Sequence, residues 1–277
     1  MIPGIGGIGA WVIVHPFNTV AVRMNLATAS GKERRQDLVI LDDGAMSLYK
    51  GLSAGVMRQV FYATSRLGLF DVMRDALAKY REIDVWSRLA VGVASGACAA
   101  VVSCPAEVSL VRMSNDSALP PELRRNYKSV VDAAVRIARE EGIFAYWRGC
   151  MPFVNRAMLV GACQVGTYDQ LKSTFNQLGV TGKFSNVFCA SMTSGLFYAS
   201  VTMPFETAKN RMASQRPDPV TKLLPYRSTV QTIGTIAKTE GVLSLWNGFW
   251  PYYLRCGGHT VFCFIIVEQL KSLYLSR

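Results

Sequence analysis

The segment Gly248–Arg255, which reads Gly-Phe-Trp-Pro-Tyr-Tyr-Leu-Arg, carries the pattern on which the whole chain is built. Its glycine is followed after seven residues by an arginine, after thirteen more by an acidic residue, and after three more by a basic one. This spacing occurs three times: in Gly51, Arg58, Asp71 and Arg74; in Gly149, Arg156, Asp169 and Lys172; and in Gly248, Arg255, Glu268 and Lys271. An arginine that recurs at one position of three apolar segments indicates a shared function, because a packing accident would not repeat.

A second set of residues indicates the same three repeats. Pro16, Pro105 and Pro204 lie in apolar segments, and each precedes an arginine (Arg23, Arg112, Arg211) and then an acid–glycine pair (Asp43, Glu141, Glu240). Repeats two and three are offset by 99 residues throughout, whereas repeats one and two are offset by 89 residues at the prolines and by 98 from Gly44 onward. We therefore expect repeats at residues 1–80, with a shortened connecting loop, at 81–178 and at 179–277.

The composition narrows the class of protein. Half of the 277 residues are apolar, yet the net charge is +11, which is typical of a chain with lipid-facing apolar surface and positive charge around an anionic ligand. A nucleic-acid partner is not expected, because the basic residues are dispersed and no reader motif occurs. The seven cysteines lack metal-ligand spacing, and no nucleophile–base pair or phosphate-binding loop is visible, so we expect no enzyme, cofactor or metal.

The apolar segments predict an all-α membrane protein with six transmembrane helices in three pseudo-threefold repeats, and short surface helices. Amphipathic patterns place the surface helices at 129–140 and 229–239, with a stub near 38–42. The first three expected spans are 2–23 (broken near Pro16), 53–74 and 86–112. The fourth is 152–173, the fifth contains Ser191, Gly195 and Ala199, and the sixth is 251–272.

Small residues at four-residue spacing let helices approach closely in a membrane. The third span has Gly92, Gly96 and Ala100 in this pattern, whereas the first span has Pro3, Gly7 and Trp11, so we expect looser packing there. Six spans place both termini on one side. The three long loops hold fourteen Lys and Arg against three in the two short linkers, so the long loops should face the more negative compartment.

The motifs resemble those of the mitochondrial carrier family, whose signature Pro-x-[Asp/Glu]-x-x-[Lys/Arg]-x-[Lys/Arg] occurs three times per chain. Residues 204–211 (Pro-Phe-Glu-Thr-Ala-Lys-Asn-Arg) fit it fully, and the other two copies fit in part. The resemblance implies a multi-pass monomer of the mitochondrial inner membrane, surrounded by lipid that includes cardiolipin, with the long loops on the matrix side.

Within this family, the stretches 58–68, 105–108, 147–150 and 251–261 most resemble the members that carry 2-oxoglutarate and malate. The implied function is an antiporter that exchanges 2-oxoglutarate for malate or related dicarboxylates by alternating access. A broader dicarboxylate or tricarboxylate carrier is the main alternative, and an uncoupled leak or pore is a further one. The three recurring arginines argue against a pore, which would have no reason to keep them.

An arginine at the centre of a membrane helix costs about 2.5–3.5 kcal/mol, so it normally faces a wet cavity on a substrate path. We expect Arg58, Arg156 and Arg255 to meet around a threefold axis and, with Arg66, to bind carboxylates through bidentate guanidinium groups. The family resemblance implies the same arginines and adds Tyr62 and Tyr168 as binding residues. His259, one turn after Arg255, either packs between helices or lines the cavity.

Two gates follow from the resemblance. A cytoplasmic gate would pair each acid with the base of the next repeat: Asp71 with Lys172, Asp169 with Lys271, and Glu268 with Arg74. The matrix gate departs from the family pattern, because its acidic positions are Asn18, Glu107 and Glu206 and its basic positions are Ala21, Leu110 and Lys209. Only Glu107 and Lys209 can pair there, and Glu206 would face Ala21. We therefore expect a weak matrix gate and a protein that rests open to the matrix.

Overall fold

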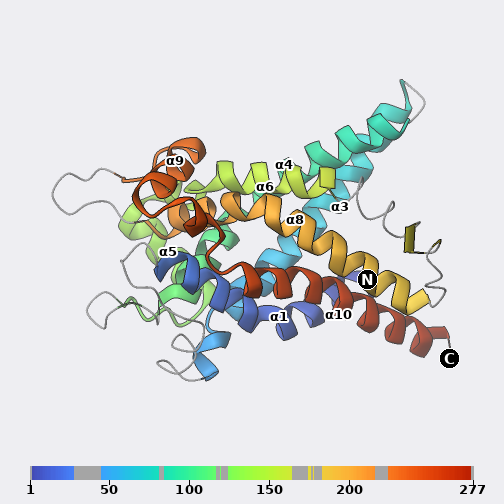
Figure 1. Cartoon of the computed structure of the whole chain (residues 1–277), viewed down its shortest axis with the longest axis horizontal. Coiled ribbons are helices and arrows are strands. Elements are labelled where there is room, and N and C mark those ends of the chain that lie inside the picture. The colour runs from blue at the N-terminus through green and yellow to red at the C-terminus, as the bar shows by residue number, and fades with distance from the viewer. Residues whose placement is uncertain are drawn as a thin grey trace.

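The structure is a computed structural model that describes residues 2–27, 45–80, 84–116, 119, 124–163, 174–175, 177, 183–215 and 224–275 (Figure 1). These residues form helices and connecting turns, with no strand among them. The long helices in this part of the chain are α1 (Ile2–Ala27), α3 (Leu52–Ala78), α4 (Val85–Asp116), α6 (Cys150–Cys163), α8 (Lys183–Ser214) and α10 (Phe249–Leu275). The predicted all-helical class with six long helices is confirmed.

The six helices form a closed ring. Each packs against the next in chain order, and α10 returns to pack against α1. The start of α1 and the end of α10 lie together, at the end of the bundle opposite α5 and α9 (Figure 1). The even number of spans predicted this arrangement.

Short helices cover the other end of the bundle. They are η2 (Ala45–Tyr49), α5 (Val130–Glu141), η4 (Ile143–Trp147), α9 (Thr229–Thr239) and η6 (Val242–Trp246). A serine begins each α-helical one: Ser129 Oγ accepts from the Asp132 backbone N–H at 3.2 Å, and Ser228 Oγ accepts from that of Gln231 at 3.3 Å. The surface helices predicted at 129–140 and 229–239 are therefore confirmed, and the stub near 38–42 lies outside the described residues.

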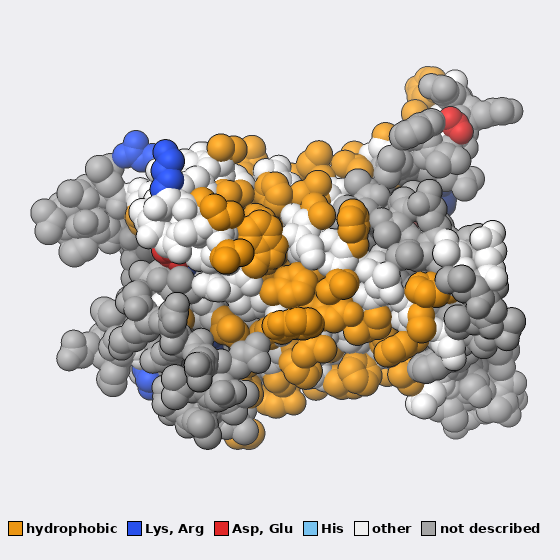
Figure 2. All heavy atoms as spheres, in the orientation of Figure 1, with side chains coloured by type: hydrophobic (Ala, Val, Ile, Leu, Met, Phe, Trp, Pro, Cys, Tyr) orange, Lys and Arg blue, Asp and Glu red, His pale blue; other side chains and the backbone are white. Residues whose placement is uncertain are grey.

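The outer surface of the bundle is apolar. Figure 2 shows a broad band of apolar side chains across the middle of one face. Exposed apolar side chains of the long helices include Val12, Ile13 and Phe17 of α1 and Phe197 of α8. Among the described residues, one stretch is long and apolar enough by length and composition to cross a membrane: Ala90–Asp116 of α4, with a mean hydropathy of 1.5.

Two expectations about the first helix are wrong. α1 continues through Pro16 without a break, and the helix beyond the proline is held by Thr19, whose Oγ1 donates to the Leu48 carbonyl of η2 at 2.8 Å. Its packing is also not loose: Trp11 is buried against α3, where a Cβ atom added at Gly55 would lie 2.2 Å from Trp11 Nε1. The large indole fills the space that Gly55 leaves.

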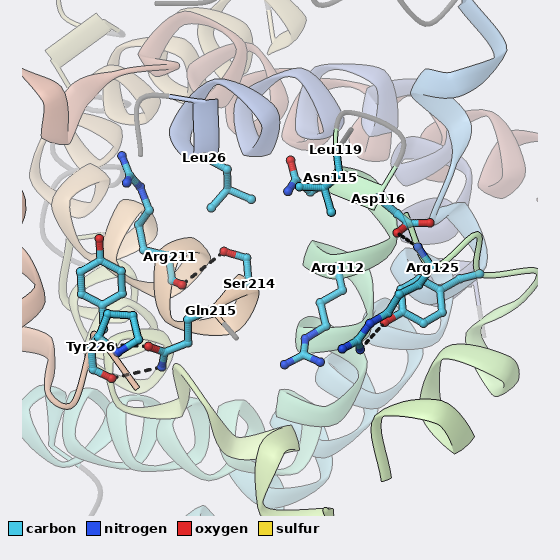
Figure 3. A pocket seen from close by; sticks show the side chains of 12 residues that line it. Leu26, Arg112, Asn115, Asp116, Leu119, Arg125, Arg211, Ser214, Gln215 and Tyr226 are labelled. Carbon is cyan, nitrogen blue, oxygen red and sulfur yellow. Dashed lines mark hydrogen bonds between the residues drawn. The ribbon is translucent and has the colours of Figure 1, made fainter. Parts of the chain in front are cut away.

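Three arginines tie the helix ends together at the α5 and α9 end. Each donates its Nε–H to a backbone carbonyl near the end of the first long helix of the next repeat: Arg23 of α1 to Ser114 of α4 at 3.0 Å, Arg112 to Ala213 of α8 at 3.0 Å, and Arg211 to Asn25 of α1 at 2.7 Å. The last carbonyls of a helix lack intrahelical partners, and these guanidinium groups supply the missing hydrogen bonds. Their positive charge also interacts favourably with the negative, C-terminal end of the helix dipole. Figure 3 shows Arg112 and Arg211 beside a cavity of about 310 Å³ between these helix ends.

The acid–glycine pairs found in the sequence hold the same arginines. Arg112 donates to Glu141 at 2.6 and 3.0 Å, and Arg211 donates to Glu240 at 3.0 and 2.7 Å; Asp43 of repeat one lies outside the described residues. Burial alone would raise the pKa of Glu141, but the hydrogen bonds from Arg112 and the charges of Arg112, Arg148 and Arg125 lower it below its usual value.

Replacing Glu141 with Gln should lower the free energy of unfolding by about 3–5 kcal/mol at neutral pH, because buried guanidinium groups lose their anion. Since folding lowers the pKa of Glu141, this stabilisation is present above the ordinary carboxyl pKa of about 4.3 and is lost as the pH falls through the folded-state pKa. The melting-temperature difference between wild type and Glu141→Gln should therefore shrink in acid. Glu140→Gln, at a half-exposed position, is the control. An equal difference at acid and neutral pH would contradict this account.

Candidate functional site

A polar cavity of about 270 Å³ lies inside the ring of long helices. Its lining comes from α1, α3, α6, α8 and α10, and includes five of the six residues expected to bind substrate: Arg58, Tyr62, Arg66, Arg156 and Arg255. The sixth, Tyr168, lies outside the described residues. His259 also lines this cavity, where its Nε2 lies 3.1 Å from Gln59 Nε2.

The three recurring arginines point inward and converge on two acidic side chains. Arg58 Nε lies 3.4 Å from Glu107 Oε2, and Arg156 Nε lies 3.0 Å from Glu206 Oε2. Arg255 Nη2 lies 3.8 Å from Glu206 Oε1. None of the three arginine side chains is more than 16% exposed, so the structure places them together inside the bundle and not against lipid.

Aromatic rings accompany the cations of the cavity. The Arg58 guanidinium carbon lies 4.3 Å from the centre of the Trp11 ring, and that of Arg255 lies 4.7 Å from the Tyr252 ring. Tyr252 Oη also accepts a hydrogen bond from Arg156 Nε at 3.1 Å. Cations are stabilised over aromatic faces, so Trp11 and Tyr252 help to hold the arginines in place. The sequence pattern did not identify either residue as part of the site.

The expected matrix gate lies directly beside these arginines. Lys209 Nζ contacts Glu107 Oε1 at 2.5 Å, so the one pair that the sequence permitted is formed. The same Nζ contacts Glu206 Oε1 at 2.9 Å, within α8. The expectation that Glu206 faces Ala21 without a cation is wrong, because Lys209, Arg156 and Arg255 all surround it.

This network closes the α5 and α9 end of the bundle in the structure. The side chains of Glu107, Glu206 and Lys209 are 7%, 3% and 3% exposed, so solvent does not reach the cavity past them. The expectation of an arrangement open at this end is therefore wrong for this structure. Two buried carboxylates with a single lysine are unfavourable, and the arginines supply the missing positive charge.

The opposite gate is only partly described. Asp71 and Arg74 are 60% and 41% exposed and pair with each other at 3.2 Å, and Arg74 also contacts Asp75 at 3.0 Å. Asp169 and Lys172 lie outside the described residues, as do the side chains of Glu268 and Lys271. The pairing between repeats at this gate stays a prediction.

Replacing Glu206 with Gln should destabilise the closed network, because three cations lose the carboxylate that they share. The removal of one member of a buried ion pair costs about 3–5 kcal/mol, so the melting temperature in detergent should fall. Glu140→Gln again serves as the control. A Glu206→Gln variant as stable as wild type would show that the three contacts do not hold this end closed.

Comparison with known proteins gives the same repeat pattern. The model of the family described as mitochondrial carrier protein matches residues 1–81, 81–178 and 181–277. The chain is 39% identical to the mitochondrial 2-oxoglutarate/malate carrier protein of Caenorhabditis elegans over 282 residues, which are 98% of this chain and 90% of that protein. It is 38% identical to the Homo sapiens protein of the same name over 284 residues, covering 98% and 89% of the two chains.

Proposed function

Because the chain belongs to the mitochondrial carrier family, we propose that it exchanges 2-oxoglutarate for malate or a related dicarboxylate. It is a transporter of the mitochondrial inner membrane, and the end with α5 and α9 faces the matrix in this proposal. Family resemblance further suggests a monomer with cardiolipin among its lipids.

The charge of the cavity is the observation that carries the proposal. In the ion-paired network at the cavity, Arg58, Arg156, Arg255 and Lys209 bring four positive charges, and Glu107 and Glu206 bring two negative ones, which leaves a net charge of +2 before Arg66 of the cavity lining is counted. A dicarboxylate carries the opposite charge. Positive charge in a cleft with low-dielectric walls attracts such an anion, and guanidinium groups match carboxylates in a bidentate geometry.

The shared arginines suggest how binding opens the matrix gate. In the structure they pair with Glu107 and Glu206 and so hold the matrix end closed. A bound dicarboxylate competes with these two side chains for the same guanidinium groups. As the arginines turn toward the substrate, the pairs that close the matrix end weaken. The ligand thus stabilises a state other than the closed one, as differential binding requires.

This competition also explains why exchange would be coupled. Without a substrate anion, opening the matrix end would leave Glu107 and Glu206 buried with fewer cations, which is unfavourable. The carrier therefore changes state only when loaded. The cytoplasmic pairs of Asp71 with Lys172, Asp169 with Lys271, and Glu268 with Arg74 would close the other end in turn. The buried matrix network also disfavours an open pore.

A broader tricarboxylate carrier is the second candidate, and Arg66 is the observation that favours it. Arg66 lines the same cavity, 6.0 Å from the centre of the Tyr62 ring. If this fifth cation also contacts the substrate, the net charge of the site becomes +3, which suits a third carboxylate. The substrate range of the protein in vesicles decides between the two.

Arg156→Ala should lower counter-exchange of labelled 2-oxoglutarate in liposomes by about 30-fold or more, because losing one partner of a desolvated charge pair costs about 2–5 kcal/mol. Arg156→Lys should retain only part of the activity, since an ammonium cannot bind a carboxylate in a bidentate geometry. Arg139→Ala, at an exposed position of α5, is the control. Wild-type uptake by a folded Arg156→Ala variant would place the binding site elsewhere.

The internal partner in the same liposomes should determine the rate. We expect fast exchange with internal malate, slower exchange with succinate, and almost none with citrate, aspartate or ADP, because the net charge of +2 suits a dianion. Exchange with internal citrate as fast as with internal malate would establish a tricarboxylate carrier. Uptake that is equally fast into liposomes with no internal anion would establish an uncoupled leak.

A further inference from the structure

The aromatic ring against Arg58 comes from another helix, Trp11 of α1, whereas the ring against Arg255 is Tyr252 of its own helix. Three residues before Arg156 and Arg255, the chain has Phe153 and Tyr252, whereas three residues before Arg58 it has Gly55. Five residues before the helix prolines, the sizes are reversed: α4 and α8 have Ala100 and Ala199, and α1 has Trp11. Repeat one therefore exchanges the large and the small residue between two helices.

The contacts show that the exchange is physical. Ala100 packs in one buried cluster with Phe153, and Ala199 packs in another with Tyr252. In repeat one, the Trp11 indole occupies the space that a side chain at residue 55 would fill, since a Cβ there would lie 2.2 Å from Trp11 Nε1. Trp11 is 2% exposed, so the space is filled completely.

The indole lies against the guanidinium of Arg58. Their separation of 4.3 Å is shorter than the 4.7 Å between Arg255 and the Tyr252 ring. Arg58 is otherwise held by Gln59 Oε1 at 3.0 Å and by the longer 3.4 Å contact with Glu107. The aromatic face therefore restricts the plane of a guanidinium that has few other short contacts.

We propose that Trp11 is a positioning residue for substrate binding, which holds Arg58 in the orientation that a carboxylate requires. This inference rests on the proposed function, in which Arg58 contacts the dicarboxylate. It adds α1 to the helices that determine affinity, through an aromatic face and not through a charge. Trp11 Nε1 makes no hydrogen bond within the described part of the chain, so another aromatic ring can take over its function.

Trp11→Ala should raise the KM for 2-oxoglutarate in counter-exchange by about 5- to 30-fold, the range expected for a desolvated cation–π contact, with a much smaller change in maximal rate. Trp11→Phe should keep a KM within about 3-fold of wild type, whereas Trp11→Leu, which fills space without an aromatic face, should resemble Trp11→Ala. Val12→Ala, at an exposed position of the same helix, is the control.

A double variant tests the exchange directly. Trp11→Ala combined with Gly55→Tyr recreates the arrangement of the third repeat, in which Tyr252 lies 4.7 Å from Arg255, and should restore the KM that Trp11→Ala alone loses. Gly55→Ala alone should raise the KM, because it displaces the indole, but should have no added effect beside Trp11→Ala.

The outcomes separate this inference from the proposed function. Arg58→Ala measured in parallel should abolish uptake; if it does not, the proposed site itself is wrong. If Arg58→Ala abolishes uptake while Trp11→Ala keeps the wild-type KM, or if Trp11→Leu matches Trp11→Phe, the positioning role is refuted. Should Trp11→Ala fail to fold, the comparison of the phenylalanine and leucine variants still decides, because both retain a large apolar side chain.

Discussion

Two carboxylates buried inside a helix bundle, those of Glu107 and Glu206, impose the constraint on which the rest of the site depends. A buried carboxylate is unfavourable unless cations and hydrogen bonds surround it. Lys209 reaches both, but one lysine cannot neutralise two acids, and repeat one offers only Ala21 at the equivalent position. Arg58, Arg156 and Arg255 complete the network. In the proposed mechanism, the residues that receive the substrate are therefore the same residues that close one end of the path.

Threefold symmetry is kept at the helix ends, where the backbone requires it. It is lost in the cavity, where the proposed ligand does not require it. The arginines of the helix ends, Arg23, Arg112 and Arg211, make the same Nε–H to carbonyl bond in all three repeats, because all three helix ends leave carbonyls unsatisfied. In the proposed function, the cavity instead receives a small anion without threefold symmetry. Side chains there can differ between repeats, provided that the charge and the packing are compensated, as Trp11 compensates for Gly55.

Most of the helices could be predicted from the sequence, because their signals are local. Apolar segments of sufficient length, serine caps before amphipathic stretches, and recurring Gly, Pro and Arg positions identify them without knowledge of the packing. The observed helices extend a few residues further than expected, as α4 does to Asp116. The reason is that Arg112 and Ser114 bond to or pack against neighbouring helices, which keeps the last turn helical. α1 likewise continues past Pro16 where Thr19 bonds to the Leu48 carbonyl of η2.

The helical class, the three repeats and the arginines that meet in the cavity could be predicted from the sequence, because each depends on spacing along one chain. The partner that each charge takes depends instead on how the helices pack. Glu206 has three cations, and the indole of Trp11 covers Arg58, although neither follows from the position of these residues within their own repeats. Such contacts join side chains of different helices, and their geometry depends on how closely those helices approach, as at Gly55, which no periodicity within a single helix encodes.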